Sequence, residues 1–469
     1  MTTKDTDAIL STPRSRITKH VICPFCGCLC DDIEVAVTLT GPLPRVPEGT
    51  IVEALNACRI GHTKFLKVRD EYRIYKPEIR SGPNKSEVQQ VSVEEAVKIA
   101  AKILADAKRP VIYGLASTSN EANVKALELA EVSGAVVDNT SSVCHGPGIE
   151  AVQRVGIGTC TLGKIKNYSD LIIYWGCNPV AAHPRHTRRY SQFIEGLFQQ
   201  VEDRKIYHID VRPTRFTDQV TNSIIVEPNK DYELLQAVRA LLRGHELQAS
   251  EVAGVPMRRV REFANDLKTA RFTTIFFGLG LTQTHGKDHN VIAAIDLTAD
   301  LNHHTKAVIM PLRGHFNVTG SNHVSTWTYG YPFSVSLEQG SPYYMPGETS
   351  AVDVLVRGEA DAFFAIAADP AASFPMAAVR EMMKIPVIVL DPKRCATTEI
   401  ADVVLPSSYV GIEADGVQTA YRMDGIPLQL DKIVDAPAGV KSDVQILDMM
   451  IREVCKLKGI KRYSEQVTL

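Results

Sequence analysis

The sequence predicts an α/β fold with a small metal-binding segment at the N-terminal end. From about residue 92 onward, helical stretches alternate with short apolar runs of strand length, a pattern typical of parallel α/β sheets. Ahead of them, four cysteines fall within the eight residues 23–30. A length of 469 residues leaves room for about three domains, since most domains have roughly 100–200 residues.

The composition is that of an ordinary globular chain. Hydrophobic residues make up 45% and charged residues 23%, which excludes disordered, collagen-like and coiled-coil chains. Lys and Arg number 52 against 54 Asp and Glu, so there is no basic excess for nucleic acid or an anionic membrane. Residues 1–19 lack the apolar core of a signal peptide, and no apolar run is long enough to span a membrane. We therefore expect a cytoplasmic protein with reduced cysteines, no membrane span and no nucleic-acid partner.

The elements follow from local patterns. A strand is expected at 32–37, directly after the cysteines, and the Pro- and Gly-rich stretch 77–87 is expected to be a linker. Helices are expected at 92–107, 119–133 and 443–456, the first with Ser92 as its N-cap. Strands are expected at 110–114, 135–138, 171–175, 205–210, 273–277, 307–311, 362–367 and 387–391.

Several of these strands run into Gly, Asn or Pro. Ligands of open α/β sheets bind at the carboxyl ends of strands, so these turns are candidate binding positions. No complete GxGxxG follows a strand and there is no Walker A sequence, which gives no support to simple NAD or P-loop nucleotide binding.

The cysteine motif is Cys23-x2-Cys26-x3-Cys30, with Cys58 further along. Four thiolates can hold a structural zinc ion or an iron–sulfur cluster. Zinc ribbons favour two separated CxxC pairs, whereas here three cysteines share one loop and the fourth stands apart. The spacing therefore favours a 4Fe–4S cluster over zinc or incidental cysteines, and Cys28 leaves the choice of ligands open.

Two further loops carry candidate chemistry. Cys144 and His145 lie in a Gly-Pro loop after the strand at 135–138, where the thiol is a candidate nucleophile or a soft ligand for a transition metal. Arg313, in a glycine-flanked loop after an apolar strand, is either simply solvated or a guanidinium fork for a carboxylate or phosphate.

Taken in order, these motifs resemble the molybdopterin oxidoreductase superfamily, in its formate dehydrogenase branch. The resemblance runs over roughly 20–425 and is strongest to the catalytic redox subunits of formylmethanofuran dehydrogenases. The segments that carry it are CPFCGCLCDD, NACRIGH, SSVCHGPG, WGCNPVAAHPRH, PLRGHFNVTGSN and TEIADVVLP. One such motif is weak support, but several in sequence order are specific.

The resemblance implies the cofactors and their ligands. Cys23, Cys26, Cys30 and Cys58 match the ligands of one 4Fe–4S cluster, and Cys144 matches the thiolate on tungsten or molybdenum, beside the dithiolene sulfurs of two molybdopterin guanine dinucleotides. His145 and Arg313 match the catalytic pair next to the metal. The positions that match contacts of the pterin nucleotides are Gly176, Asn178, Pro179, Asp210, Arg212, Thr214, Pro228, Asp231, Gly278, Gly280, Gly314 and Asn317, with the segment 413–422 in a similar region.

One position departs from the family pattern. Formate dehydrogenases have a lysine two residues after the fourth cluster cysteine, between cluster and pterin, and this chain has Ile60 there. Arg59, one residue earlier, is the expected replacement cation.

The implied reaction is the reversible reduction of carbon dioxide to formate by a ferredoxin-linked oxidoreductase acting on an aldehyde or oxo group. Arg313 is expected to hold the O–C–O group, and His145, with a pKa near the working pH, to exchange the proton. A separate amidohydrolase-like metallohydrolase subunit would then condense formate with methanofuran, as in methanogenesis from carbon dioxide. The alternatives are a formate dehydrogenase with another electron acceptor and a non-redox scaffold subunit of a formyltransferase/hydrolase complex. The metal, tungsten or molybdenum, stays open.

The resemblance also implies domains and partners. The expected division is an iron–sulfur domain at 1–85, a discontinuous α/β domain at 86–140 and 321–469, and a second α/β domain at 141–320, both α/β domains Rossmann-like and pterin-binding. The C-terminal β-barrel domain of single-chain relatives is expected to be absent and supplied by a small β-barrel subunit. Ferredoxin- or polyferredoxin-type subunits are the expected electron donors.

Overall fold

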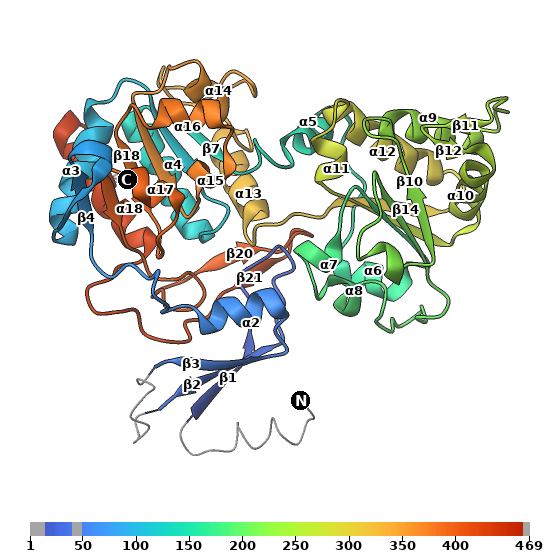
Figure 1. The fold of residues 1–469 in the computed structure, drawn as a ribbon, viewed down its shortest axis with the longest axis horizontal. Helices are drawn as coiled ribbons and strands as arrows, with labels where there is room; N and C mark the ends of the chain where they lie inside the picture. Colours follow the sequence, from blue (N-terminus) through green and yellow to red (C-terminus); the bar gives the residue numbers. More distant parts are fainter. Residues whose placement is uncertain (1–14, 40–48, 463–469) are drawn as a thin grey trace, which may run out of the picture.

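The computed structural model describes residues 15–39 and 49–462. Figure 1 shows two α/β bodies side by side, with the N-terminal strands and helix α2 beneath them. Most of the polar stretch expected at 1–19 lies outside the described residues. Across the described part of the chain, no helix is both long and apolar enough to cross a membrane.

The N-terminal part is a three-stranded antiparallel sheet of β1 (Ser15–Val21), β2 (Ile33–Thr38) and β3 (Ile51–Leu55), followed by α2 (Arg59–Leu66). The cysteine loop joins β1 to β2. It is closed by a hydrogen bond from Cys23 N–H to the Cys30 carbonyl, 2.9 Å, and by a turn from Leu29 N–H to the Cys26 carbonyl, 3.0 Å. These bonds make the loop's cysteines converge.

The left-hand body in Figure 1 contains a nine-stranded sheet. Its five central strands are parallel, and both edges are antiparallel. The order is β16 (Tyr343–Tyr344), β15 (Val335–Ser336), β7 (Val136–Asn139), β6 (Pro110–Gly114), β17 (Ala362–Ile366), β18 (Val387–Leu390), β19 (Val403–Leu405), β4 (Glu78–Ser81), β5 (Glu87–Gln90).

The linker expected at 77–87 is wrong, because this stretch forms the β4–β5 hairpin at the sheet edge. Pairing of β4 with β19 holds it there, and Arg80 contributes two bonds: its N–H to the Asp402 carbonyl, 2.8 Å, and its guanidinium to the Thr398 carbonyl, 2.7 Å. Partners more than 300 residues away cannot be found from local composition.

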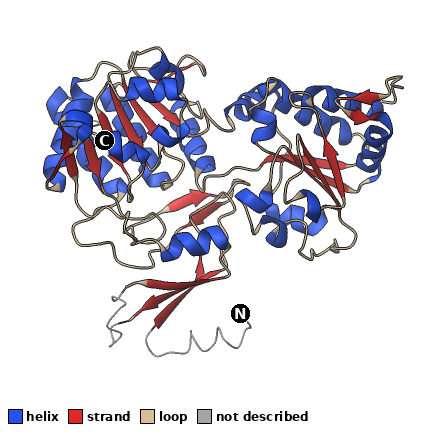
Figure 2. Ribbon diagram, viewed as in Figure 1, coloured by secondary structure: helices blue, strands red, loops and turns tan. Residues whose placement is uncertain are grey.

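Helices cover both faces of this sheet (Figure 2). One face packs against α3 (Val93–Asp106), α4 (Asn120–Ser133) and α18 (Asp443–Lys458), and the other against α14 (Ala351–Val356) and α16 (Met376–Met382). The three longer helices confirm the expected helices, since Ser92, Ser119 and Ser442 each accept a backbone N–H at the N-terminus.

The right-hand body contains a wholly parallel five-stranded sheet. Its order is β10 (Asn222–Ile225), β9 (Lys205–Asp210), β8 (Leu171–Trp175), β13 (Phe272–Phe277), β14 (Lys306–Pro311). One face is covered by α5 (Gly146–Val155), α9 (Asp231–Leu242), α10 (Met257–Thr269) and α12 (Lys287–Leu301). The other face shares a core with the N-terminal part, where Ile172, Tyr174 and Phe276 pack in the same cluster as the cysteine loop.

Short elements complete the structure. The hairpin of β20 (Thr419–Tyr421) and β21 (Pro427–Gln429) lies between the bodies and α2. The others are α6 (Leu162–Tyr168), α7 (Pro179–Ala182), α8 (His186–Arg189), α11 (Leu279–Thr282), α13 (Val318–Tyr329), α15 (Pro370–Ser373), α17 (Ala396–Ile400), β11 (Glu251–Val252), β12 (Val255–Pro256), η1 (Pro83–Lys85) and η2 (Thr217–Gln219).

Candidate functional site

Five cysteines of the N-terminal part line one small hollow: Cys23, Cys26, Cys28, Cys30 and Cys58. Among the described residues, no group of three or more His, Cys, Asp or Glu side chains is placed to hold a metal ion. A structural zinc ion needs its sulfurs at about 2.3 Å from one point. Four thiolates that line one hollow can hold either such an ion or an iron–sulfur cluster.

Gly61, in α2, keeps this hollow open. A Cβ at this position would lie 3.1 Å from Cys23 Sγ and 4.0 Å from Cys58 Sγ. Cys58 is the N-cap residue of α2, and its sulfur accepts the Gly61 N–H at 3.5 Å. A side chain here would therefore displace the sulfurs that face the hollow.

The thiols are buried together, and burial changes how readily they ionise. It raises the pKa of Cys23 well above its usual value and that of Cys30 to about 12, with neighbouring thiols adding to both shifts. Cys26 differs, because a hydrogen bond from Cys28 lowers the pKa of its thiol. Such thiols become thiolates when a metal binds, so site formation and metal binding are coupled.

Cys144 lies directly after β7, at the junction of the two α/β bodies. Its N–H donates to the Ser141 carbonyl, 2.9 Å, and its own carbonyl accepts from Thr282 Oγ1, 3.0 Å, and Gln283 Nε2, 2.7 Å. Burial raises the pKa of the half-buried Cys144 thiol to about 11, and the charge of Arg313 opposes this shift. The loop is thus fixed by backbone contacts while its sulfur faces a cation.

Arg313 follows β14, and its charge acts on the Cys144 thiol. Its Nη1 donates to Asn322 Oδ1 at 2.6 Å, and its buried Nε has no hydrogen-bond partner in the described part of the chain. Burial lowers the pKa of the guanidinium to about 10, so it stays charged at neutral pH. Asn322 therefore fixes one edge of the guanidinium, and the Nε–H group remains available to donate a hydrogen bond to a ligand.

Asn322, in α13, holds Arg313 and was not predicted. Its Nδ2 donates to Ser141 Oγ, 3.0 Å, and to the Pro332 carbonyl, 3.0 Å, so its Oδ1 is aimed at the guanidinium. The available sequence signal was a polar residue nine positions after Arg313, within the PLRGHFNVTGSN segment.

His145 is buried, and the expectation that its pKa lies near the working pH is wrong for this structure. Burial lowers the pKa of the ring to about 3, with the charge of Arg313 and the neighbouring His183 adding to the effect. Its Nδ1 has no partner among the described residues, and its ring packs edge-on against Phe277 with the ring centroids 5.8 Å apart. The ring is neutral at neutral pH.

The Arg313 loop touches the cysteine loop. Gly27 N–H donates to the Gly314 carbonyl, 3.0 Å, and the ring of His183 is 2.6 Å from the Arg313 carbonyl through Nε2. His183 also lines the cysteine hollow. Only short stretches of backbone therefore separate the cysteines from Arg313.

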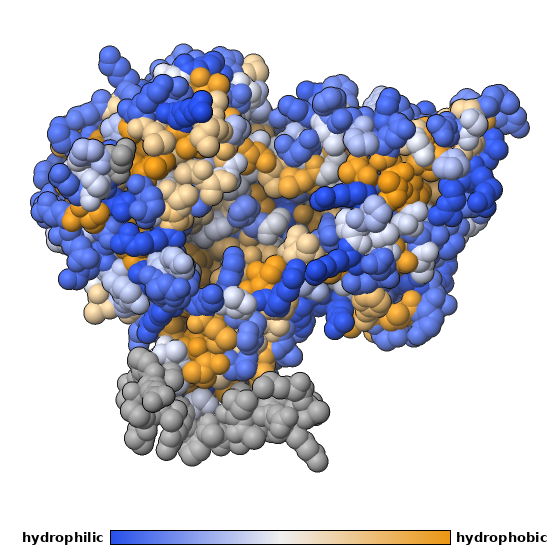
Figure 3. Space-filling model, viewed as in Figure 1, coloured by the Kyte–Doolittle hydropathy of each residue, from blue (hydrophilic) through white to orange (hydrophobic). Residues whose placement is uncertain are grey.

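Two hollows flank the loop 313–316, one of about 440 Å³ and one of about 420 Å³. Arg313 and Asn322 line the smaller, and His315 and Phe316 line the larger. The larger extends along the carboxyl ends of β6, β17, β18 and β19, where Ser408 Oγ is buried without a partner in the described chain. Figure 3 shows the surface hollowed between the two bodies. Both volumes fall within the roughly 300–1,000 Å³ of small-molecule and cofactor sites.

Three lysines line the larger hollow, Lys64, Lys67 and Lys393, and Arg59 is not among its lining residues. Arg59 is exposed in the first turn of α2 and does not line this hollow, and its role as the replacement for the family lysine stays a prediction. Lys64 lines the hollow, its Nζ is 5.4 Å from the centroid of the Phe25 ring, and its charge contributes to lowering the pKa of Cys26. It lies between the cysteines and the hollow.

Three predicted glycines meet where β8 and β13 end. Gly176 has a φ of +59°, and a Cβ on it would lie 2.7 Å from Gly280 Cα. The Gly280 N–H donates to the Gly176 carbonyl, 2.9 Å, and the Gly278 N–H to the Trp175 carbonyl, 3.1 Å. Asn178 then caps the short helix that starts at Pro179. The backbones of Gly176, Gly278 and Gly280 are so close together that none of these positions has room for a side chain.

The other residues predicted to contact the pterin nucleotides differ in burial: some are buried and others are exposed. Asp231 is buried, with Oδ1 accepting from Trp175 Nε1 at 2.8 Å and Oδ2 without a partner among the described residues. Asp210 ends β9 and accepts the Val211 N–H, 2.8 Å, while Thr214 Oγ1 accepts the Phe216 N–H, 3.1 Å. The exposed positions are Arg212 and Pro228.

Asn317 joins structural segments. Its buried Nδ2 donates to the Thr118 carbonyl, 2.8 Å, and to Asn120 Oδ1, 3.0 Å, while its Oδ1 accepts the Tyr421 N–H, 2.8 Å. The side chain predicted to contact a cofactor is therefore engaged within the protein. Gly314 contributes its carbonyl to the cysteine loop instead.

The chain is similar in sequence to known proteins. A family model described as molybdopterin oxidoreductase matches residues 73–453. The chain is 46% identical to a subunit of the tungsten-containing formylmethanofuran dehydrogenase 2 of Methanocaldococcus jannaschii, over 94% of this chain and 99% of that relative.

Two solved structures have a similar fold. A chain of the formyltransferase/hydrolase complex FhcABCD from Methylorubrum extorquens, solved with methylofuran, aligns with a TM-score of 0.65 at 19% identity, over 82% of this chain and all of that chain. Acetylene hydratase from Pelobacter acetylenicus aligns with a TM-score of 0.67 at 15% identity, over 94% of this chain and 69% of that one. At these identities the likeness is one of fold.

Proposed function

This chain belongs to the molybdopterin oxidoreductase family, among the subunits of tungsten-containing formylmethanofuran dehydrogenases, and from that premise we propose that it reduces carbon dioxide reversibly to formate. The observation that carries the proposal is the contact between three parts of the site. The cysteine hollow, the Arg313 loop and the two large hollows meet around the hydrogen bond from Gly27 to Gly314.

The residues fit the cofactors of this family. Four of the five cysteines around the small hollow would hold a 4Fe–4S cluster. Cys144 supplies a soft thiolate that suits tungsten or molybdenum. The two hollows, with the unpartnered Ser408 Oγ in one and Arg313 Nε in the other, have room and donors for two pterin guanine dinucleotides. When bound, the metal with its pterins supplies a centre that exchanges two electrons.

The chain's own residues then bind and orient the substrate. Arg313, held on one edge by Asn322, presents its free N–H groups to the oxygens of carbon dioxide or formate and stabilises the negative charge that develops there. The reduction takes up two electrons and one proton. Burial disfavours the charged form of His145, so the ring is neutral. It lines the site as a neutral group that can form hydrogen bonds.

We expect Gly61→Val to prevent assembly of the iron–sulfur cluster. The added side chain would occupy the space next to Cys23 Sγ and Cys58 Sγ. Iron and acid-labile sulfide in the purified variant should fall to background. The matched control is Gly158→Val, at an exposed position where a Cβ meets nothing within 4 Å. A Gly61→Val protein with full iron content would contradict the placement of the cluster.

Lys64→Met should make the cluster harder to reduce. A cation beside Cys26 stabilises the extra electron of the reduced cluster, so its loss is expected to shift the midpoint potential by roughly 60 mV to more negative values, a tenfold change in the one-electron equilibrium. An EPR-monitored redox titration measures this shift. The control is Lys98→Met, at an exposed position on α3. Equal midpoint potentials in the two variants would show that Lys64 does not influence reduction of the cluster.

We further propose the assembly expected from the family. The division into 1–85, 86–140 with 321–469, and 141–320 is retained as the domain proposal, and a metallohydrolase-like subunit, a small β-barrel subunit and ferredoxin-type subunits are the proposed partners. The formyltransferase/hydrolase complex of the structural relative supports a multisubunit assembly with a hydrolase.

The activity itself is tested on the natively purified complex. Reduced methyl viologen and ¹³C-labelled bicarbonate should yield ¹³C-formate, or the formylated furan when methanofuran is added. Oxidation of free formate that is independent of methanofuran and linked to another acceptor would favour a formate dehydrogenase. No reduced product at all would exclude the proposal.

A further inference from the structure

Cys28 is a fifth cysteine in a hollow that needs only four. A 4Fe–4S cluster takes four thiolates, and its proposed ligands are Cys23, Cys26, Cys30 and Cys58. Cys28 lines the same hollow and, at 1% exposed, is more deeply buried than any of them. The proposed function leaves this sulfur without a role.

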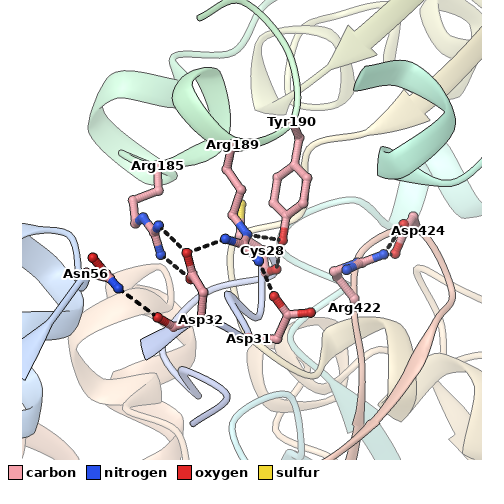
Figure 4. A network of polar contacts seen from close by, with 9 residues as sticks. All are labelled: Cys28, Asp31, Asp32, Asn56, Arg185, Arg189, Tyr190, Arg422 and Asp424. Carbon is pink, nitrogen blue, oxygen red and sulfur yellow. Dashed lines mark hydrogen bonds and ion pairs between the residues drawn. The ribbon is translucent and has the colours of Figure 1, made fainter. Parts of the chain in front are cut away.

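The loop that carries Cys28 is fastened to α8 and the residues beside it. Figure 4 shows Arg185 in a bidentate pair with Asp32, at 2.5 and 2.6 Å, and Arg189 paired with the same carboxylate. The Tyr190 hydroxyl donates to the Cys28 carbonyl at 3.5 Å. Bidentate pairs of this kind fix geometry as well as adding energy. The backbone of Cys28 therefore has a set position relative to α8.

The Cys28 sulfur contacts His186, the first residue of α8. Its Sγ lies 4.0 Å from Nδ1 of this fully buried ring. The ring packs edge-on against Phe276 and Tyr174, with centroids 4.8 and 5.8 Å apart, and its Nε2 has no hydrogen-bond partner among the described residues. A neutral imidazole carries a single N–H. That proton is therefore assigned to Nδ1, where it donates to the Cys28 sulfur.

The Cys28 thiol also reaches Cys26. The two side chains are hydrogen-bonded to each other, and a thiol has one S–H to donate. With the His186 N–H directed at the Cys28 sulfur, the S–H of Cys28 is directed at the Cys26 sulfur. The donation thus runs from His186 to Cys28 and from Cys28 to Cys26.

We propose that Cys28 is a positioning residue and not a ligand: its S–H, oriented by His186, donates to the Cys26 sulfur of the assembled cluster and raises the cluster's reduction potential. The inference rests on the proposed function, because it requires a 4Fe–4S cluster in the hollow. Hydrogen bonds to ligand sulfurs help to set the potential of such clusters, since they stabilise the extra negative charge of the reduced form. The buried aromatic surroundings of His186 strengthen these hydrogen bonds, because they screen charge weakly.

The test is an EPR-monitored redox titration of the natively purified complex carrying Cys28→Ala. We expect the iron content of the wild type and a one-electron reduction about tenfold less favourable, which is a shift of about 59 mV to more negative potential. Cys28→Ser keeps a hydroxyl donor and should titrate near the wild-type potential. The control is Cys455→Ala, which removes a buried thiol of α18 that does not line the hollow.

His186→Leu is an independent variant, because it leaves the cysteine loop unchanged. Leucine suits the apolar surroundings of the ring but removes the N–H that orients Cys28. The potential should shift in the same direction as in Cys28→Ala, by a smaller amount. Combining the two changes should shift it no further than Cys28→Ala alone, since His186 acts through Cys28.

Each outcome decides for or against the proposal. Iron at background in an assembled Cys28→Ala complex would make Cys28 a ligand and overturn it. Equal shifts in Cys28→Ala and Cys28→Ser would also overturn it. If Cys28→Ala does not assemble, His186→Leu decides: a more negative potential supports the proposal, and the wild-type potential refutes it. A wild-type chain without any 4Fe–4S cluster would instead refute the proposed function.

Discussion

Replacing Cys144 with alanine is expected to abolish carbon dioxide reduction while leaving the iron–sulfur cluster intact. The Cys144 loop is held at the junction of the two bodies by hydrogen bonds of its own backbone, so removal of the thiol takes away the proposed metal ligand without unfolding the loop. Formate production by the variant complex should fall to background, and the EPR signal of the reduced cluster should keep its wild-type intensity.

The control for this variant is Cys160→Ala. Cys160 is also partly buried but lines none of the three hollows of the site. It should retain full activity. Wild-type turnover in Cys144→Ala would refute the assignment of this sulfur to the metal, and loss of both activity and cluster signal would point to a folding defect.

The second large effect is expected for Arg313→Lys. Lysine keeps the positive charge but loses the planar fork that is anchored on Asn322 and open at Nε. Removing one well-placed donor from a charge-stabilising site costs about 10²–10³ in kcat, and a loss of this size is expected here.

Steady-state kinetics of the complex with bicarbonate and reduced viologen measure this loss. The matched control, Arg154→Lys, changes an exposed arginine paired with Asp288 and should leave kcat as it is. If both lysine variants turn over at the wild-type rate, Arg313 does not stabilise the reacting oxygens.

Most of the repeating secondary structure could be predicted because its signals are local. The helices α3, α4 and α18 begin at serines that cap them, and the apolar strands β8, β9 and β18 lie where their runs predict. The β4–β5 hairpin could not be predicted, since its stability comes from β19 and from Asp402, far along the chain.

The site was predictable where chemistry is concentrated in one motif. Cysteine spacing and the Cys144 and Arg313 loops pointed to segments that lie close together in the structure, but which side chains face the hollows depends on the packing of whole elements. Arg59 is next to Cys58 in sequence and faces solvent, whereas Lys64, more than one turn further along α2, faces the larger hollow. Burial of His145 likewise comes from both bodies closing around it.

The central claim is that this chain holds a tungsten or molybdenum centre. It is tested most directly by measuring both metals by mass spectrometry in the native complex, normalised to the amount of this chain. We predict about one tungsten or molybdenum atom per chain, as expected for one soft-thiolate metal site. Neither metal above background, in a complex that still reduces carbon dioxide, would contradict the account.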